Sequence, residues 1–168
     1  MNKTDRRTFI QGLISNASEP ISATQIARRM GVSRQTIVGD VALLRARGED
    51  IIATPAGYQY NHVDANEVLL VCRHLPADTA DEMGRIVALG GIVRDVIVDH
   101  PLYGVLRGEL NISTPGDIKL FVAKMAAQKG HLLSELTSGI HTHTILYQDE
   151  EQLEAIRASL REAGYLYE

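Results

Sequence analysis

The sequence predicts an α+β protein made of two units, residues 1–60 and residues 66–168, with residues 61–65 as a linker between them. Two observations predict this division. The apolar pattern is helical for most of the first unit, whereas strands and helices alternate in the second. Residues 1–60 carry eight basic and five acidic residues, a net charge of +3, and the remaining residues carry nine basic and sixteen acidic residues, a net charge of −7. The basic unit therefore suits an anionic partner better than the acidic unit does.

The composition narrows the class of protein further. With 45% hydrophobic and 23% charged residues, both units can bury a core and neither is expected to be disordered. No stretch approaches about 18 consecutive apolar residues and the charged start lacks a signal core, so we expect a cytoplasmic protein without membrane-spanning helices. Cys72 is the single cysteine, which excludes an internal disulfide framework and a multi-cysteine zinc finger.

Three helices and a hairpin are expected in the first unit. Apolar residues at helical spacing predict the helices, and Gly31-Val32-Ser33 predicts a tight turn in which the glycine takes a left-handed backbone angle. Two short apolar runs around Thr54-Pro55-Ala56-Gly57 predict a β-hairpin. The expected helices span residues 5–17, 23–30 and 34–47, and the expected strands span residues 51–53 and 58–60.

This order of elements is typical of a winged helix-turn-helix, which reads double-stranded DNA with the first turn of its third helix. That turn is Ser33, Arg34, Gln35 and Thr36. An arginine can bind guanine with two hydrogen bonds, a glutamine can bind adenine, and hydroxyl groups can hold phosphates. The alternative is that Arg34 and Gln35 merely solubilise an ordinary capped helix. We favour the DNA interpretation because the turn, the hairpin and the charge distribution agree.

Gly39 has a low helix propensity for its place in an expected helix. It falls in the middle of the third helix on the outward face, where a glycine costs about 1 kcal/mol relative to alanine. Either DNA approaches the helix closely at this position, or the helix is locally loosened. The sequence leaves both interpretations open.

The second unit is expected to be an antiparallel sheet covered by helices, an α+β sandwich. No glycine-rich phosphate-binding loop of standard spacing interrupts it. Asp78 is expected to cap its first helix. We expect strands at residues 67–73, 92–98, 105–112 and 140–147, and helices at residues 78–89, from Ser113-Thr114-Pro115 onward, and at residues 149–163.

Histidines supply the chemistry of this unit. His141 and His143 are two residues apart on an expected strand, so their imidazoles lie on the same face. Imidazole is the commonest protein ligand of divalent transition metals, although paired histidines are often purely structural. His74 ends another strand, and Glu82 follows eight residues later near the start of a helix. These four side chains could therefore converge at one edge of the sheet.

Several segments resemble one known family. They are SRQTIVGDVALLRA, the His74 segment with Glu82, GIVRDVIVDHPLYG and SGIHTHTI. The family is that of the niacin-responsive repressors of NAD biosynthesis and niacin uptake, which join a biotin-repressor-like winged helix to a 3H domain. The resemblance implies an HPr-like α/β sandwich, a homodimer, operator DNA as partner and nicotinate as co-repressor. It also implies one metal ion per chain, held by His74, Glu82, His141 and His143. Gly39 departs from the family, which has a larger polar residue there, so the base preference can differ.

This ligand set limits the choice of metal, and the resemblance implies the effector. Mixed nitrogen and oxygen ligands suit nickel, zinc, iron, manganese or cobalt. Four protein ligands would saturate tetrahedral zinc, whereas a five- or six-coordinate ion keeps a position for nicotinate. His100 and Arg94 are the expected effector-binding residues, although a histidine before a proline can simply hydrogen-bond within a turn. We expect His62 and His131 to be ordinary surface residues and Cys72 to belong to the core.

Two other functions use the same residues. The first is a metal-sensing repressor, in which the ion itself is the signal. The second is a metal-dependent hydrolase fused to a DNA-binding module, with Glu82 as its base. The hydrolase is disfavoured because the second unit is short and shows no set of nucleophile and base, so we do not expect an enzyme.

Overall fold

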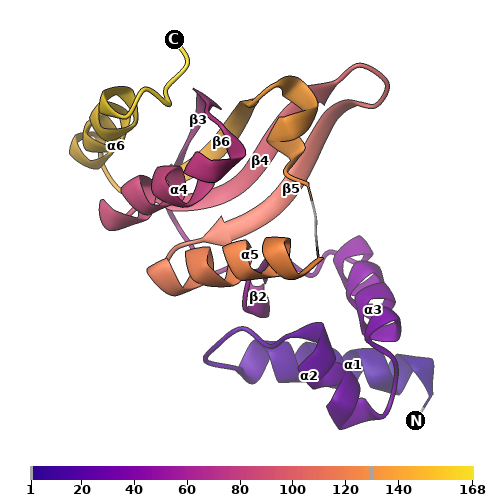
Figure 1. Ribbon diagram of the computed structural model, residues 1–168. Coiled ribbons are helices and arrows are strands. Elements are labelled where there is room, and N and C mark those ends of the chain that lie inside the picture. The colour runs from indigo at the N-terminus through magenta and orange to yellow at the C-terminus, as the bar shows by residue number, and fades with distance from the viewer. Residues whose placement is uncertain (1, 129–130) are drawn as a thin grey trace. The chain divides into compact units, whose positions relative to one another are not determined.

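The computed structural model describes residues 2–128 and 131–168 (Figure 1). The chain divides into two compact units, Met1–Val63 and Asp64–Glu168. Among the described residues, no helix is both long enough and apolar enough to cross a membrane. The predicted combination of an N-terminal helix-turn-helix with a mixed α+β unit is confirmed.

The first unit contains three helices and a two-stranded antiparallel hairpin, as predicted. One buried cluster joins the helices to the hairpin, and its largest members are isoleucines that are fully shielded from solvent. Hydrophobic burial of this cluster is the main force that holds the short helices together. The elements are α1 (Lys3–Asn16), α2 (Ala23–Met30), α3 (Arg34–Ala46), β1 (Ile51–Thr54) and β2 (Gly57–Tyr60).

Local capping fixes the helix-turn-helix. Ser22 and Gln25 form a reciprocal capping box at the start of α2. Gly31 ends that helix with a left-handed φ of +63°, which a glycine adopts without steric cost. Ser33 then caps α3 by accepting a hydrogen bond from the Thr36 amide at 3.1 Å. The tight turn predicted at residues 31–33 is therefore confirmed.

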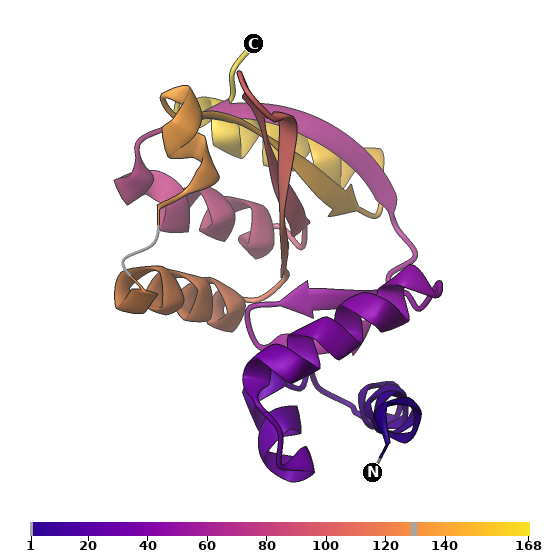
Figure 2. The ribbon, with the colours of Figure 1, turned by 90° about the vertical axis from the view of Figure 1, so that its right-hand side faces the viewer.

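The second unit is built on a four-stranded antiparallel sheet with the strand order β3-β6-β4-β5. Residues from α4, α5 and α6 join inward-facing residues of all four strands in one apolar core, and Figure 2 shows α4 and α5 beside the sheet. The strands are β3 (Asn66–Arg73), β4 (Ile92–His100), β5 (Gly104–Ile112) and β6 (Ile140–Tyr147), and the helices are α4 (Thr79–Ala88), α5 (Pro115–Gln128) and α6 (Glu150–Glu162).

The structure corrects two details of this unit. Asp78 does not cap α4 through its side chain, because the 3-10 turn η1 (Pro76–Asp78) leads directly into the helix and leaves Asp78 in a helical conformation. The strands β4 and β5 also extend further than expected, so only three residues separate them. A second 3-10 helix, η2 (Leu133–Thr137), precedes β6.

Candidate metal centre and nucleic-acid interface

Strand pairing brings three histidines to one place in the second unit. His141 and His143 alternate with threonines on β6 and therefore share one face of the sheet. The neighbouring strand β3 pairs Cys72 with His141, and His74 follows directly after that strand. The His74 and His143 rings each lie edge-on to the His141 ring, with centroids 4.7 Å and 4.6 Å away, respectively.

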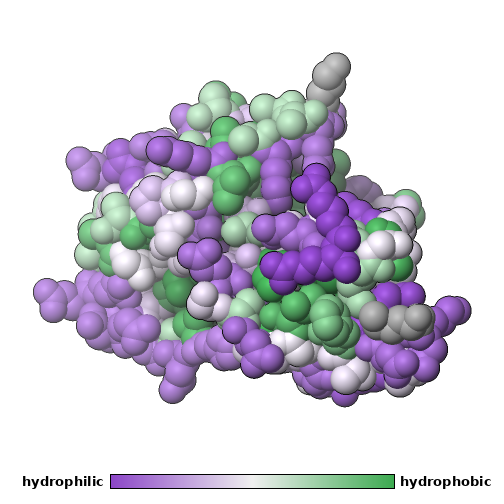
Figure 3. Space-filling model, turned by 90° about the horizontal axis from the view of Figure 1, so that it is seen from below, coloured by the Kyte–Doolittle hydropathy of each residue, from purple (hydrophilic) through white to green (hydrophobic). Residues whose placement is uncertain are grey.

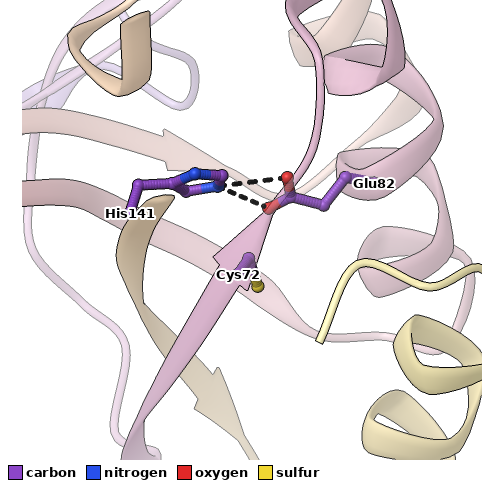
Figure 4. Close-up of side chains that lie close together, drawn as sticks. All are labelled: Cys72, Glu82 and His141. Carbon is purple, nitrogen blue, oxygen red and sulfur yellow. Dashed lines mark hydrogen bonds and ion pairs between the residues drawn. The ribbon is translucent and has the colours of Figure 1, made fainter. Parts of the chain in front are cut away.

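Glu82 on the first turns of α4 meets all three rings. Its carboxylate lies 3.2 Å from Nε2 of His141 and 2.5 Å from Nε2 of His143, and it also contacts Nε2 of His74 directly. Between 1% and 3% of each of these four side chains is exposed. Figure 4 shows Glu82 and His141 pointing toward each other. The structure thus brings together the four residues that the sequence proposed as metal ligands.

Backbone carbonyls determine which ring nitrogen faces the carboxylate. Nδ1 of His74 lies 2.8 Å from the carbonyl oxygen of Leu75, and Nδ1 of His141 lies 2.8 Å from that of Gly139. Nδ1 of His143 lies 2.6 Å from the carbonyl oxygen of Asp95. Because a carbonyl only accepts hydrogen bonds, each Nδ1 carries a proton and each Nε2 of a neutral ring presents a lone pair. This outer ring of contacts was not visible in the sequence, because the Asp95 contact depends on strand pairing and the other two depend on the local backbone conformation at Leu75 and Gly139.

The four side chains of the cluster offer more hydrogen-bond acceptors than donors. Three neutral imidazoles direct three lone pairs at a carboxylate, which is itself only an acceptor. Burial alone would raise the pKa of Glu82, but the neighbouring His143 and His141 lower it well below its ordinary value. Burial alone would lower the pKa of His143, but the Glu82 carboxylate raises it. One protonated ring balances the single carboxylate, whereas a divalent ion satisfies all four side chains at once. The donor set therefore fits a divalent metal ion.

Cys72 lies beside this cluster as well as in the core. Its thiol is fully buried, and its sulfur, a nitrogen of His141 and an oxygen of Glu82 lie within 4.8 Å of one another (Figure 4). Burial and the charge of Glu82 raise the pKa of the thiol, so Cys72 is a neutral thiol here. Cys72 lies two residues before His74, which directly follows β3, and this spacing is the sequence signal that could have found the neighbour.

A small cavity of about 30 Å³ adjoins the cluster. Phe121, Leu133 and Ser134 are among its lining residues, together with Glu82 and the three histidines. Neither Arg94 nor His100 is among its lining residues. Arg94 forms an ion pair with Glu67, and Nδ1 of His100 accepts hydrogen bonds from the two amides that follow its proline. The structure therefore does not bring these two predicted effector residues to the cluster.

The predicted DNA-reading turn is exposed at the start of α3. The side chains of Arg34 and Gln35 form no hydrogen bond or ion pair with any residue that the structure describes. The hydroxyls of Ser33 and Thr36 instead lie 2.8 Å apart and contact each other within the helix cap. In the view of Figure 3, most of the surface is hydrophilic and apolar side chains form smaller patches. The side chains of Arg34 and Gln35 thus remain available to a partner outside the chain, and the hydroxyl pair stabilises the conformation of the turn.

Asp40 holds α3 against α1. It is 3% exposed and lies 2.6 Å from Nε of Arg6 and 3.7 Å from a guanidinium nitrogen of Arg7. The pairing with Asp40 raises the pKa of Arg6. This contact fixes the rotation of α3 about its own axis, and with it the face that the helix presents outward. The fold and this exposed turn together define a DNA-binding protein of the winged helix-turn-helix class.

Comparisons with known proteins identify the family. Residues 6–59 match the profile of an HTH domain and residues 67–168 match that of the 3H domain. The probable transcription repressor NiaR of Thermotoga maritima is 38% identical over 167 residues, covering 99% of this chain and 95% of that protein. The transcription repressor NadR of Bacillus subtilis is 34% identical over 167 residues, covering 96% of this chain and 93% of that protein. The chain belongs to this family of transcription repressors, which are not enzymes.

Proposed function

We propose that this repressor controls genes of NAD biosynthesis and niacin uptake, and that nicotinate acts as its co-repressor at a metal ion in the second unit. The observation that carries the proposal is the convergence of three histidine Nε2 atoms on the buried Glu82 carboxylate. The repressor acts in the cytoplasm, where its operator DNA lies. Its resemblance to niacin-responsive repressors supplies the identity of the effector.

His74, His141, His143 and Glu82 would hold one divalent ion of nickel, zinc, iron, manganese or cobalt. When bound, such an ion supplies a positive charge and, if five- or six-coordinate, an open position for a carboxylate or a pyridine nitrogen. The chain itself contributes orientation. The Leu75, Gly139 and Asp95 carbonyls hold the three rings with Nε2 turned inward, which reduces the cost of ordering them around an ion.

Nicotinate would enter beside the ion at the cavity lined by Phe121, Leu133 and Ser134. Phe121 offers a ring for contact with a pyridine, and Ser134 offers a hydroxyl. At about 30 Å³, the cavity is too small for the ligand unless the Leu133–Ser134 side moves. Binding would therefore be linked to a change of conformation, which a co-repressor requires.

The repressor would act as a homodimer on a two-fold operator, with its two α3 helices one DNA turn apart. Large apolar side chains on the second unit remain exposed and are suited to contact with a second copy. Leu69 and Val71 lie on β3, and Leu102, Tyr103 and Val105 lie at the tip of the β4–β5 hairpin. Nicotinate changes operator affinity only by favouring one dimer arrangement, typically by about 1–3 kcal/mol.

The test is operator binding by the double variant His141→Ala/His143→Ala, measured with and without nicotinate in the presence of metal. We expect the variant to lose its metal and its response to nicotinate, because two of four ligands are gone. His62→Ala/His131→Ala is the matched control, since these two histidines lie outside the cluster and should leave the response unchanged. A full nicotinate response in the first variant would refute the metal-anchored mechanism.

A metal-sensing repressor is the second candidate, because it uses the same four ligands. Separate titrations of metal and nicotinate into the same operator-binding assay distinguish the two. Metal alone should give the full change in affinity if the ion is the signal. Under our proposal, metal alone leaves operator affinity low and nicotinate raises it.

A further inference from the structure

One residue of α3 is not explained by the fold. Gly39 lies near the middle of a 13-residue helix, where glycine is the least favourable residue after proline. The residue is exposed, and a Cβ atom added to it would meet no atom within 4 Å. Alanine would therefore fit at this position, and it would stabilise the helix.

Two other glycines of the same unit have a clear structural cause. Gly57 has a φ of +141°, and an added Cβ would lie 2.3 Å from the backbone of Ile21. Gly31 has the left-handed φ of +63° that ends α2. Gly39 has neither a positive φ nor a close neighbour, and α3 continues through it without interruption. A locally loosened helix is therefore not the reason for this glycine.

Gly39 lies on the exposed face of α3. Ile37, Asp40, Val41 and Leu44 form the buried side of α3. Gly39 lies four residues after Gln35, so both occupy the exposed face that begins with the DNA-reading turn. The buried contact of Asp40 with Arg6 keeps this face outward.

We propose that Gly39 is a specificity-determining residue at which DNA approaches the backbone of α3 closely. A bare helix surface there allows the helix to lie deep in the major groove, so that Arg34 and Gln35 reach the base edges. A side chain at this position would hold the helix away from the bases. This inference rests on DNA binding by the first unit. Its experiment is run with metal and nicotinate present, because the proposed function makes operator affinity low without nicotinate.

The experiment compares Gly39→Ala with Gly12→Ala in the full chain. Gly12 lies inside α1, also has no atom within 4 Å of an added Cβ, and shares a surface hollow with the carboxylate of Glu49, which would repel phosphate. Operator duplexes are first selected from a random library with the unaltered protein. Both variants should raise the melting temperature by about 4 °C, because alanine favours a helix.

Only Gly39→Ala should weaken binding to the selected duplex, by about 10-fold or more, the scale of one lost base contact. A second selection with Gly39→Gln should give a different preferred sequence. If Gly39→Ala melts higher and binds the duplex as tightly as before, or if Gly12→Ala loses as much affinity, the inference is wrong. If the unaltered protein selects no duplex, sequence-specific DNA binding by the first unit is refuted. That outcome differs from one in which a duplex is selected and Gly39→Ala binds it unchanged.

Discussion

The two units place their functional side chains in opposite environments. Arg34 and Gln35 on α3 are exposed and have no partner among the described residues. In the second unit, Glu82 and the three histidines around it are at most 3% exposed and contact one another. The first arrangement suits a large polyanion, which must reach the side chains from outside. The second suits a small cation, which gains most where water is excluded.

This difference has consequences for substitutions. An exposed reader can be replaced with little effect on the fold, so its loss should appear only in DNA binding. A member of the buried cluster cannot be replaced as freely, because its neighbours then lose a partner in a place without water. Variants of each unit should therefore separate DNA affinity from metal affinity.

The largest effect is expected for Glu82→Gln, which keeps the size of the side chain and removes its charge. Four ligands share a binding free energy of about 10–16 kcal/mol in structural zinc sites, so losing one should weaken metal binding more than about 100-fold. Calorimetric titration of metal into the chelated protein measures this. Glu135→Gln is the control, because Glu135 is the acidic partner of His131 outside the cluster. Unchanged metal affinity in Glu82→Gln would remove Glu82 from the site.

Asp40→Asn tests how much the buried ion pairs of Asp40 stabilise the first unit. Removing this buried charge leaves Arg6 and Arg7 without an anionic partner, so the first unit should melt roughly 10 °C lower. Metal binding by the second unit should not change. Circular dichroism monitors the thermal unfolding, and a parallel titration measures metal binding. Together they separate the stability of the first unit from the metal affinity of the second. A fall in metal affinity would show that the units are energetically coupled.

Arg34→Ala should reduce operator affinity by about 1–3 kcal/mol, or about 5- to 150-fold, and relax the preference at one base pair. The melting temperature should stay the same because the side chain is exposed. Arg157→Ala on α6 is the control for removing a positive charge elsewhere; this arginine is half-buried and paired with Glu154. Equal losses on selected and random duplexes would make Arg34 a phosphate contact and not a base reader.

The smallest effect is expected for Tyr165→Phe. The Tyr165 ring lies 5.4 Å from the His74 ring, and its hydroxyl donates to Asp81 at 2.7 Å. Losing only the hydroxyl should loosen His74 slightly and weaken metal binding by less than about 10-fold. Tyr167→Phe, near the same end of the chain, is the control. A loss as large as that of Glu82→Gln would make the Tyr165 hydroxyl part of the site itself.

Prediction from sequence succeeded best where the signal is local. The Gly31 turn, the Ser33 cap and the two-residue spacing of His141 and His143 follow from backbone geometry over a few residues. The prediction that Asp78 caps α4 was wrong, because the chain enters this helix through a 3-10 turn that removes the need for a side-chain cap. Prediction from sequence also placed Arg94 and His100 near the effector, whereas their actual partners are a glutamate on another strand and a neighbouring turn.

By itself, the sequence determined the helix-turn-helix, the alternation of strands and helices after it, and the common face of His141 and His143. These properties depend on helical and strand periodicity and on capping, which act between residues close in the chain. Only the tertiary structure decided that Glu82 lies against all three histidines, that carbonyls from three separate segments orient the rings, and that Cys72 borders the cluster. Except for the contacts of His74 with Leu75 and of His141 with Gly139, which are local, these contacts join residues far apart in the chain. They therefore exist only after the sheet has paired and α4 has packed upon it.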